Sequence, residues 1–462
     1  MVKITLLSLG LIIGSTTLSP SYASESAPAS ITLNPQTLRS ALLEGNLSIQ
    51  ESLLRLHDAK DQINIARGNL LPYLNLGGLI TSSGSPTFLL SSVQYLLPFL
   101  IPSNWFDYRA QKNLFEAEIL SYRILQLNAY SSALSMYYTV LADQQYQNIY
   151  IEQAEDLRKV YETRRSQYVA GTISVEDLLQ AQSQGLMAQI RASQMRALQK
   201  QEIAALRAAL GLPLSTEIWI DSSAMPLSEW ETGRSISDVA EEAFRLAPEQ
   251  IQITWLEKAA IQQKWSRIFG FIGSASLSSQ ASVNGSGNSD HASFSDLKGS
   301  ANIGIGFGYY PSIQLSDRSI DHIRLRLEEL KQELKQTLEA ELTSLDEYKG
   351  QLELASIVET NMRDVYDIVV NKFKFGLTDF VNVLTARAQL LDAGVARIKA
   401  QHDLNLLRVT LHRTMLSDQF AFVTGCNFST PQKVNKGFRW PWQWGKGRKT
   451  SHKSLDELCK QN

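Results

Sequence analysis

The feature that most constrains this sequence is a stretch of about 66 residues, Ser103 to Tyr168, that contains no proline and consists largely of residues that favour helices. Apolar residues recur within it at mixed spacings of three and four, as at Leu134, Tyr138 and Leu141. At 1.5 Å per residue, a helix of that length spans roughly 100 Å. We therefore predict an elongated molecule, because a globular core cannot enclose such a helix.

A second segment repeats this design. Ser316 to Phe373 is predicted to be another long helix, and it carries a stripe made of Leu327, Leu330, Leu334, Leu338, Leu342 and Leu345. Each long helix is followed by a glycine and then by a predicted return helix, from about Thr172 to Leu210 and from Leu377 to about Leu416. The glycines, Gly171 and Gly376, suit a left-handed residue that ends a helix.

The two halves of the chain match each other at an offset of about 205 residues. Tyr168 to Ala181 corresponds to Phe373 to Ala386, and Ala41 to Ile49 corresponds to Ala243 to Ile251 at a similar offset. The predicted division of the chain is a signal peptide at 1–23, a first repeat at 24–220, a second repeat at 221–425 and a C-terminal tail at 426–462.

Segments with period-two alternation separate the helices. The clearest is Ala301 to Tyr310, which is predicted to be a strand, paired with Phe271 to Val283 across a surface loop at Asn284 to Lys298. The first half offers a weaker hairpin, Tyr73 to Ser83 and Phe88 to Leu97.

Prolines mark the ends of the second strand in each half. Pro98 and Pro311 are predicted to close these strands, and Ser103 and Ser316 are predicted to cap the long helices that follow. Both halves are thus expected to switch from strand to helix in the same way.

The N-terminus has the parts of a secretory signal. Lys3 precedes an apolar run from Ile4 to Ile13, and Ser21 and Ala23 form a small-residue cleavage site. An uncleaved anchor is the alternative, although the run is about half the roughly 20 residues that a spanning helix needs. No other stretch is long and apolar enough, so a mature chain that spans a membrane would have to do so with strands.

Four strands cannot close a barrel, and an open edge in lipid leaves backbone groups unpaired. Three copies would supply twelve strands, with the helices continuing as a common tube. The expected fold is mainly α with a β-barrel portion, built on a duplicated helix-strand-strand-helix plan, with four strands per chain shared in a trimeric barrel above a long helical tunnel. A soluble hairpin packed on the helices is the alternative.

Charge and motif content argue against other classes of function. The 44 basic residues nearly balance the 46 acidic ones, so no overall field favours nucleic acid. The six histidines are scattered without metal-ligand spacing, and no glycine-rich phosphate loop opens a helix. We expect no catalytic residues, no cofactor and no metal site, and we predict that the chain is not an enzyme.

The signal peptide, the duplicated plan, Asn69 to Pro72 leading into a strand, and the turn from Tyr168 to Ala181 together resemble the TolC family of outer-membrane efflux proteins. The resemblance implies a homotrimer in the outer membrane of a Gram-negative bacterium, in contact with outer-membrane lipid and extending into the periplasm. It also implies a passive duct for efflux or type I secretion that docks a periplasmic adaptor (membrane fusion) protein and an inner-membrane pump of the RND, ABC or MFS type. The alternative is a secreted coiled coil that spaces or tethers the envelope without conducting.

The resemblance places a gate at the start of the return helices and adaptor docking at the helix turns. The candidate gate residues are Glu176, Asp177, Asp379, Asn382 and Thr385. The candidate docking residues are Tyr168, Gly171, Thr172, Phe373, Gly376 and Leu377. Two alternatives stay open: one is that the acids serve only to complement the helix dipole, and the other is that the aromatic residues serve only to pack the coiled coil.

The C-terminal tail is not explained by the resemblance. It interleaves Trp440, Trp442 and Trp444 with basic residues, a pattern that can bind nucleic acid, anionic lipid or cell-wall polymer. Secretion argues against nucleic acid, and a disordered or loosely docked tail is the favoured interpretation. The two cysteines of the chain, Cys426 and Cys459, flank this region, and whether they form a disulfide stays open.

Overall fold

The structure is a computed structural model that describes residues 30–81, 87–221, 236–283, 292–417 and 420. The predicted signal peptide, both cysteines and the basic tail lie outside the described residues.

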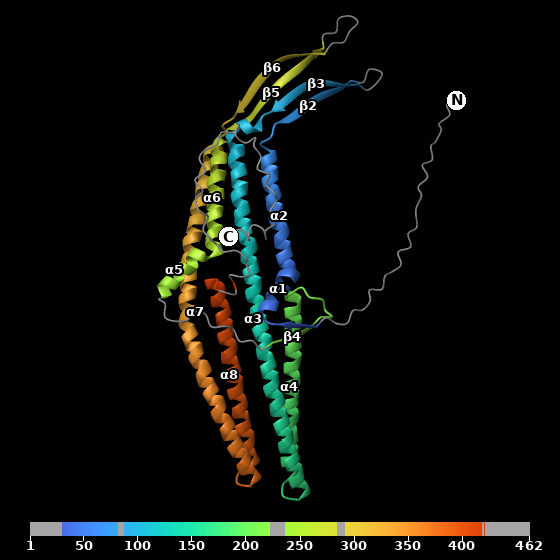
Figure 1. The fold of residues 1–462 in the computed structure, drawn as a ribbon, viewed down its shortest axis with the longest axis vertical. Coiled ribbons are helices and arrows are strands. Elements are labelled where there is room, and N and C mark those ends of the chain that lie inside the picture. Colours follow the sequence, from blue (N-terminus) through green and yellow to red (C-terminus); the bar gives the residue numbers. More distant parts are fainter. Residues whose placement is uncertain (1–29, 82–86, 222–235, 284–291, 418–419, 421–462) are drawn as a thin grey trace, which may run out of the picture.

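In the described residues, both halves run through a short strand, two shorter helices, two further strands and two long helices (Figure 1). The first half contains β1 (Ser30–Leu33), α1 (Pro35–Gly45), α2 (Leu47–Gly68), β2 (Tyr73–Thr81), β3 (Thr87–Leu96), the 3-10 turn η1 (Pro98–Leu100), α3 (Pro102–Val169) and α4 (Val175–Ala209). The second contains β4 (Glu217–Ile220), α5 (Ile236–Leu246), α6 (Pro248–Phe269), β5 (Ile272–Val283), β6 (Ala292–Ile303), α7 (Tyr309–Lys374) and α8 (Phe380–Met415). The expected mainly α fold with a duplicated plan is confirmed.

The long helices form as predicted, but their N-terminal caps differ. α3 has 68 residues and α7 has 66, so each spans roughly 100 Å. α3 begins at Pro102. Proline has no backbone N–H, so the first helical position leaves no donor in need of a partner. The preceding residue, Ile101, provides no side-chain cap. The predicted cap at Ser103 is therefore wrong.

The start of α7 corrects three expectations. The helix begins at Tyr309, so Pro311 lies in its first turn, where a missing N–H costs nothing, and does not close a strand. Ser316 does not cap the helix either. It is buried inside α7 and accepts a hydrogen bond of 2.8 Å from Arg267 of α6.

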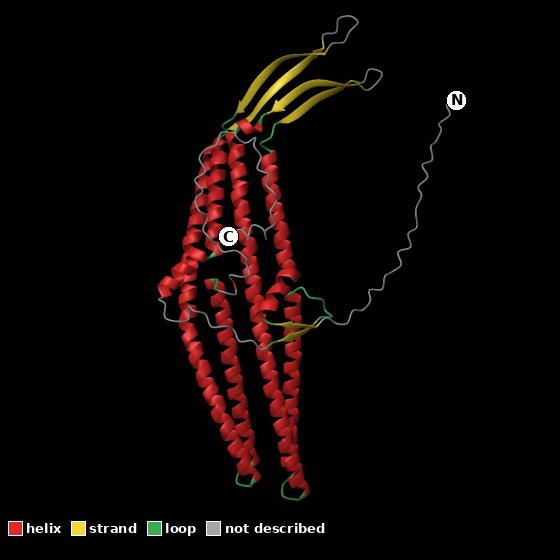
Figure 2. Cartoon of the chain, viewed as in Figure 1, coloured by secondary structure: helices red, strands yellow, loops and turns green. Residues whose placement is uncertain are grey.

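The helices assemble into four rods that lie side by side (Figures 1 and 2). α2 sits above α4 and α6 above α8, while α3 and α7 each run the full length. α3 packs against α2, α4, α6 and α8, and α7 packs against α6 and α8. The order across the molecule is α2/α4, α3, α6/α8, α7, and within the described chain α7 makes no extensive contact with α2 or α4. We call α2/α4 and α7 the edge rods.

The main core lies halfway along the rods, where a two-stranded parallel sheet crosses them. β1 pairs with β4, with Ser30 opposite Glu217. Tyr130 and Tyr137 are fully enclosed beside this sheet, and the Tyr137 hydroxyl donates to the backbone carbonyl of Asp221. This sheet, which pairs β1 with β4, was not predicted from the sequence.

The other four strands form one antiparallel sheet at the end of the rods, in the order β2-β3-β5-β6. The predicted hairpin of the first half and the strand from about Phe271 to Val283 are confirmed. The edges of the sheet are β2, which follows α2, and β6, which precedes α7. None of the helices in the described segments is long and apolar enough to cross a membrane.

The predicted strand from Ala301 to Tyr310 is wrong. β6 starts at Ala292, inside the expected surface loop, and ends at Ile303, which pairs with Ile272 of β5. A Cβ atom added to any of the glycines at 304, 306 and 308 would meet no other atom within 4 Å, so these positions offer no strand packing. Of the alternating segment, 301–303 end β6, 304–308 connect the sheet to the helix, and Tyr309 and Tyr310 already belong to α7.

Candidate gate and docking tips

The turns of the two long hairpins lie next to each other at the end opposite the four-stranded sheet (Figure 2). Gly171 and Gly376 adopt φ angles of 73° and 70°, the left-handed conformation expected from the sequence. Beyond each glycine, the backbone N–H closes the helix end: Thr172 donates to Gln167 at 3.0 Å and Leu377 to Lys372 at 2.9 Å. The two turns therefore have the same geometry.

The return helices begin a few residues later than expected because polar residues cap them. Ser174 accepts a hydrogen bond of 3.1 Å from the backbone of Asp177 and so caps α4. Asp379 accepts one of 3.0 Å from the backbone of Asn382 and so caps α8. One candidate gate carboxylate, Asp379, thus already has a local structural role.

The remaining gate candidates lie on the first turns of the return helices. Glu176 is exposed in α4 and complements the helix dipole together with Asp177. In α8, the amide of Asn382 donates to the Thr378 hydroxyl at 3.0 Å and the Thr385 hydroxyl donates to the Val381 carbonyl at 2.9 Å. Within one chain, these residues are divided between two separate turns.

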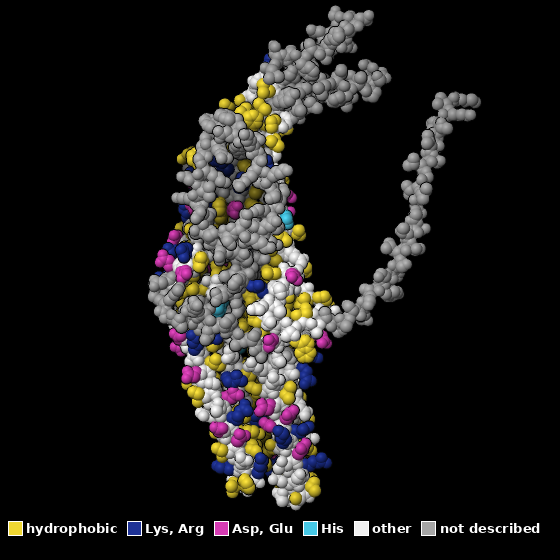
Figure 3. All heavy atoms as spheres, in the orientation of Figure 1, with side chains coloured by type: hydrophobic (Ala, Val, Ile, Leu, Met, Phe, Trp, Pro, Cys, Tyr) yellow, Lys and Arg dark blue, Asp and Glu magenta, His cyan; other side chains and the backbone are white. Residues whose placement is uncertain are grey.

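The docking candidates differ in accessibility. Tyr168, Thr172 and Leu377 are exposed, Leu377 at 74%. Phe373 is only 7% exposed, so it packs within the tip and is not available on its surface. Phe375, in the same turn, is 80% exposed. Figure 3 shows hydrophobic side chains gathered at both tips, below helices covered with mixed charges.

Phe373 belongs to a cluster that joins all four helices of the tips. The Arg164 guanidinium of α3 lies 5.0 Å from the Phe373 ring and 4.8 Å from the Phe380 ring. Ala181 of α4 and Val383 of α8 complete the cluster. Because Arg164 is itself buried, it acts as a packing residue between the two hairpins.

A second buried arginine connects the hairpins above this cluster. Arg387 of α8, 4% exposed, forms an ion pair of 3.2 Å with Asp156 of α3 and lies 5.3 Å from the Tyr366 ring. Neither arginine was predicted from the sequence to lie at the tips. A signal was present, since Arg164 follows Leu157 and Tyr161 in the apolar register of α3 and Arg387 follows Phe380 and Val383 in that of α8.

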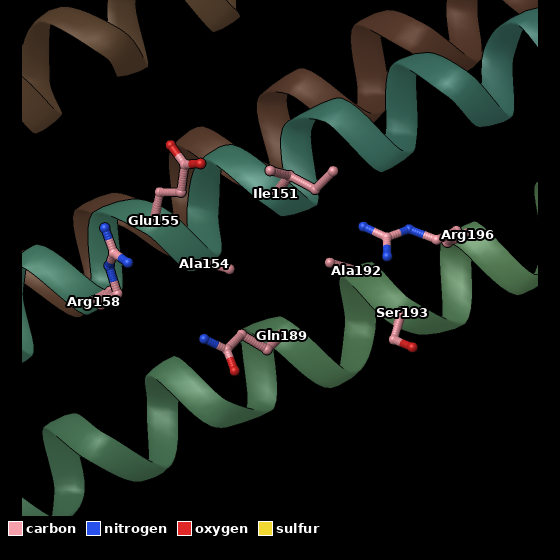
Figure 4. A pocket seen from close by; sticks show the side chains of 8 residues that line it. All are labelled: Ile151, Ala154, Glu155, Arg158, Gln189, Ala192, Ser193 and Arg196. Carbon is pink, nitrogen blue, oxygen red and sulfur yellow. The ribbon is translucent and has the colours of Figure 1, made fainter.

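The first hairpin also has an open groove of about 270 Å³ between α3 and α4 (Figure 4). Small residues create it, since Ala154 and Ala192 are the side chains that meet between the helices. Arg158 and Arg196 lie at its two ends. The groove holds no constellation of residues suited to catalysis, and the described residues contain no group of three or more His, Cys, Asp or Glu that could hold a metal ion.

The fold is that of TolC-like outer-membrane channels. The structure of the Campylobacter jejuni CmeC outer membrane channel matches with a TM-score of 0.70 at 16% identity, covering 89% of this chain and 93% of that chain. The structure of VceC of Vibrio cholerae matches with a TM-score of 0.67 at 14% identity, covering 82% of this chain and 95% of that chain. The open state of the Neisseria gonorrhoeae MtrE outer membrane channel matches with a TM-score of 0.61 at 15% identity, covering 82% of this chain and 88% of that chain.

Residues 38–212, from within α1 to just beyond α4, match the family model described as outer membrane efflux protein. The predicted resemblance to that family is therefore confirmed. The comparison with curated proteins gave no match.

Proposed function

We propose that this chain is a subunit of a passive exit channel in the outer membrane of a Gram-negative bacterium. One observation carries the proposal: an open four-stranded sheet is joined to helical rods roughly 100 Å long. The rods end, at the far side from the sheet, in the two turns at Gly171 and Gly376. A sheet that meets lipid must not leave its edges unpaired, and β2 and β6 are such edges.

Closure requires further copies of the chain. Three copies of a four-stranded sheet supply twelve strands, an even number within the range of outer-membrane barrels. The helical rods of the three copies then continue the barrel as a tunnel into the periplasm, and outer-membrane lipid surrounds the strands. The channel acts by conduction and carries out no catalysis.

The exposed residues of the tips are the proposed docking surface for a periplasmic adaptor, which connects the channel to an inner-membrane pump of the RND, ABC or MFS type. Tyr168, Phe375 and Leu377 present apolar surface at the end of the molecule, where a soluble protein has no reason to expose it. In a trimer, Glu176, Asp177 and Asp379 recur three times around the entrance, where like charges would favour the passage of cations.

The first test is single-channel conductance in planar bilayers together with the native mass of the protein purified from outer membranes. A trimer that conducts supports the proposal. A monomer that stays in solution without detergent and passes no current would instead indicate an envelope spacer or tether.

Docking is tested separately with Phe375→Ser and Leu377→Ser, which remove exposed apolar groups without touching the buried Phe373. We expect trimers with normal conductance but with export lost. Leu214→Ser is the control, because Leu214 is 88% exposed far from the tips. Export that survives both tip substitutions would contradict docking at the turns.

A further inference from the structure

Exposed apolar side chains are distributed unequally among the four rods. Along α3 and α8, the large apolar residues that are exposed lie only at the tips, namely Tyr168, Val169 and Val381. The edge rods expose them along their length. On α2, α4 and α7 these residues include Leu47, Leu54, Ile65, Leu179, Leu186, Ile190, Leu315, Leu325, Leu354, Val358, Val365 and Ile368.

On α2 these residues share one face with two acids. Ile49, Ser52 and Leu56 are buried against α3. At 100° per residue, Leu47, Leu54, Asp58, Asp61 and Ile65 all fall on the opposite side of the helix. Asp58 and Asp61 are exposed and form no ion pair within the described chain. The outer face of α2 is thus apolar at its ends and acidic in the middle.

The upper part of α7 has the complementary arrangement. Ser316 and Ile320 are buried toward α6. Leu315, Arg318, His322 and Leu325 lie on the opposite face. Arg318 and His322 have no ion-pair partner in the described residues, whereas the nearby Arg324 and Arg326 pair with Glu257 and Glu329, each at 2.7 Å.

The lower parts of the edge rods have apolar faces instead. On α4, Leu179, Leu186 and Ile190 point away from the alanines that pack on α3. On α7, the exposed residues Leu354, Val358, Val365 and Ile368 follow one another at spacings of four, seven and three, on a face turned away from α8. Such stripes are typical of a coiled-coil seam that lacks its partner helix.

We propose that α7 of one copy packs along the α2/α4 rod of a second copy, with Arg318 and His322 facing Asp58 and Asp61 in the upper half and apolar residues meeting in the lower half. This inference rests on the trimer proposed above and identifies the surfaces that close it. The sheet supports it, because β2 continues from α2 and β6 leads into α7, so the same two edges meet in the barrel and in the tunnel.

The heights of the facing residues agree. Asp61 lies about 10 Å below the upper end of α2, and Arg318 lies about 14 Å below that of α7. At the tips, Leu179 follows Gly171 by eight residues and Ile368 precedes Gly376 by eight residues. The acidic segment therefore meets the basic one, and the apolar stripes meet each other.

Charge exchange tests the upper seam. Asp58→Lys with Asp61→Lys, or Arg318→Glu with His322→Glu, should each raise the ratio of monomer to trimer on the order of tenfold in native mass measurements, because like charges then face each other. All four substitutions together should restore the trimer. Glu155→Lys with Glu162→Lys on α3 changes the net charge by the same amount as the aspartate double variant and should leave the trimer intact. The proposal would be overturned if the variant with all four substitutions formed no more trimer than the weaker of the two double variants.

Cysteine pairing tests the lower seam in a chain that carries Cys426→Ser and Cys459→Ser. Leu179→Cys with Ile368→Cys should give covalent oligomers on oxidation, while Leu179→Cys with Leu325→Cys should give none because the two positions differ in height. Trimers that conduct but neither cross-link at this pair nor respond to charge exchange would refute the seam and leave the channel in place. If no trimer forms in the unmodified chain, the proposed function itself fails.

Discussion

At the scale of a single residue, the two roles considered for Asp379, capping of α8 and lining of the channel entrance, can be tested separately. Its carboxylate accepts the Asn382 N–H at 3.0 Å, and asparagine caps helices as well as aspartate does. Asp379→Asn should therefore keep the stability of the tip, whereas Asp379→Ala should lower it by about 1 kcal/mol. If Asp379 also lines the entrance, both variants should reduce cation selectivity in bilayer recordings. Unchanged selectivity in Asp379→Asn would leave the cap as its only role.

Asp143 of α3 predicts a pH dependence of stability. It is buried, and one of its carboxylate oxygens lacks a hydrogen-bond partner. Burial raises its pKa above the ordinary 3.8, the charge of Glu202 raises the pKa further, and His402 opposes both. The folded state therefore prefers the protonated acid, so this contribution to stability is complete below pH 3.8 and is lost as the pH rises through the higher pKa of the folded state.

Asp143→Asn should remove the loss of folding stability that ionisation of Asp143 causes as the pH rises. We expect its unfolding temperature at pH 7 to exceed that of the unmodified protein by about 2 °C, with the difference vanishing toward pH 4. The exposed Asp392→Asn in α8 serves as the control and should not change the pH profile. A constant difference at all pH values would show that packing, and not ionisation, is responsible.

Between elements, the ion pair of Arg387 with Asp156 is the contact to test, because it joins α8 of one hairpin to α3 of the other. Arg387→Met keeps the length of the side chain but leaves Asp156 without its buried partner, which should cost about 1–3 kcal/mol. We expect the tips to loosen and the open-channel conductance to rise. Arg158→Met is the matched control, since Arg158 and Glu162 are exposed and 3.9 Å apart.

The elements also show which parts of the fold the sequence can predict. The 68 residues of α3 repeat one period through many turns, so the helix was predictable almost to its ends. The segment 301–310 alternates just as clearly, but only its first residues have a strand partner, and pairing cannot be read from alternation alone. β1 and β4, four residues each and distant in sequence, carry too little pattern to be recognised.

On the scale of the whole molecule, the length of the rods is the property that the proposed function requires. In the proposed function the tips reach partners held at the inner membrane, and the distance that they cover is set by helices with a rise of 1.5 Å per residue. Loss of one heptad from each long helix preserves the apolar register and shortens the tunnel by about 10 Å. Segments 145–151 and 191–197 are equidistant from Gly171, and 350–356 and 396–402 are equidistant from Gly376.

Deleting these four heptads together should leave trimers that insert and conduct in bilayers, because the sheet and the tips are unchanged. Export from cells should fall, because the tips no longer reach their partners. Deleting a heptad from α3 and α4 alone is the control: it staggers the two tips, separates Arg164 from Phe373 and Phe380, and should impair the trimer as well as export. Full export by the shortened channel would mean that the partners adjust to its length, and rod length would then not be a requirement of the function.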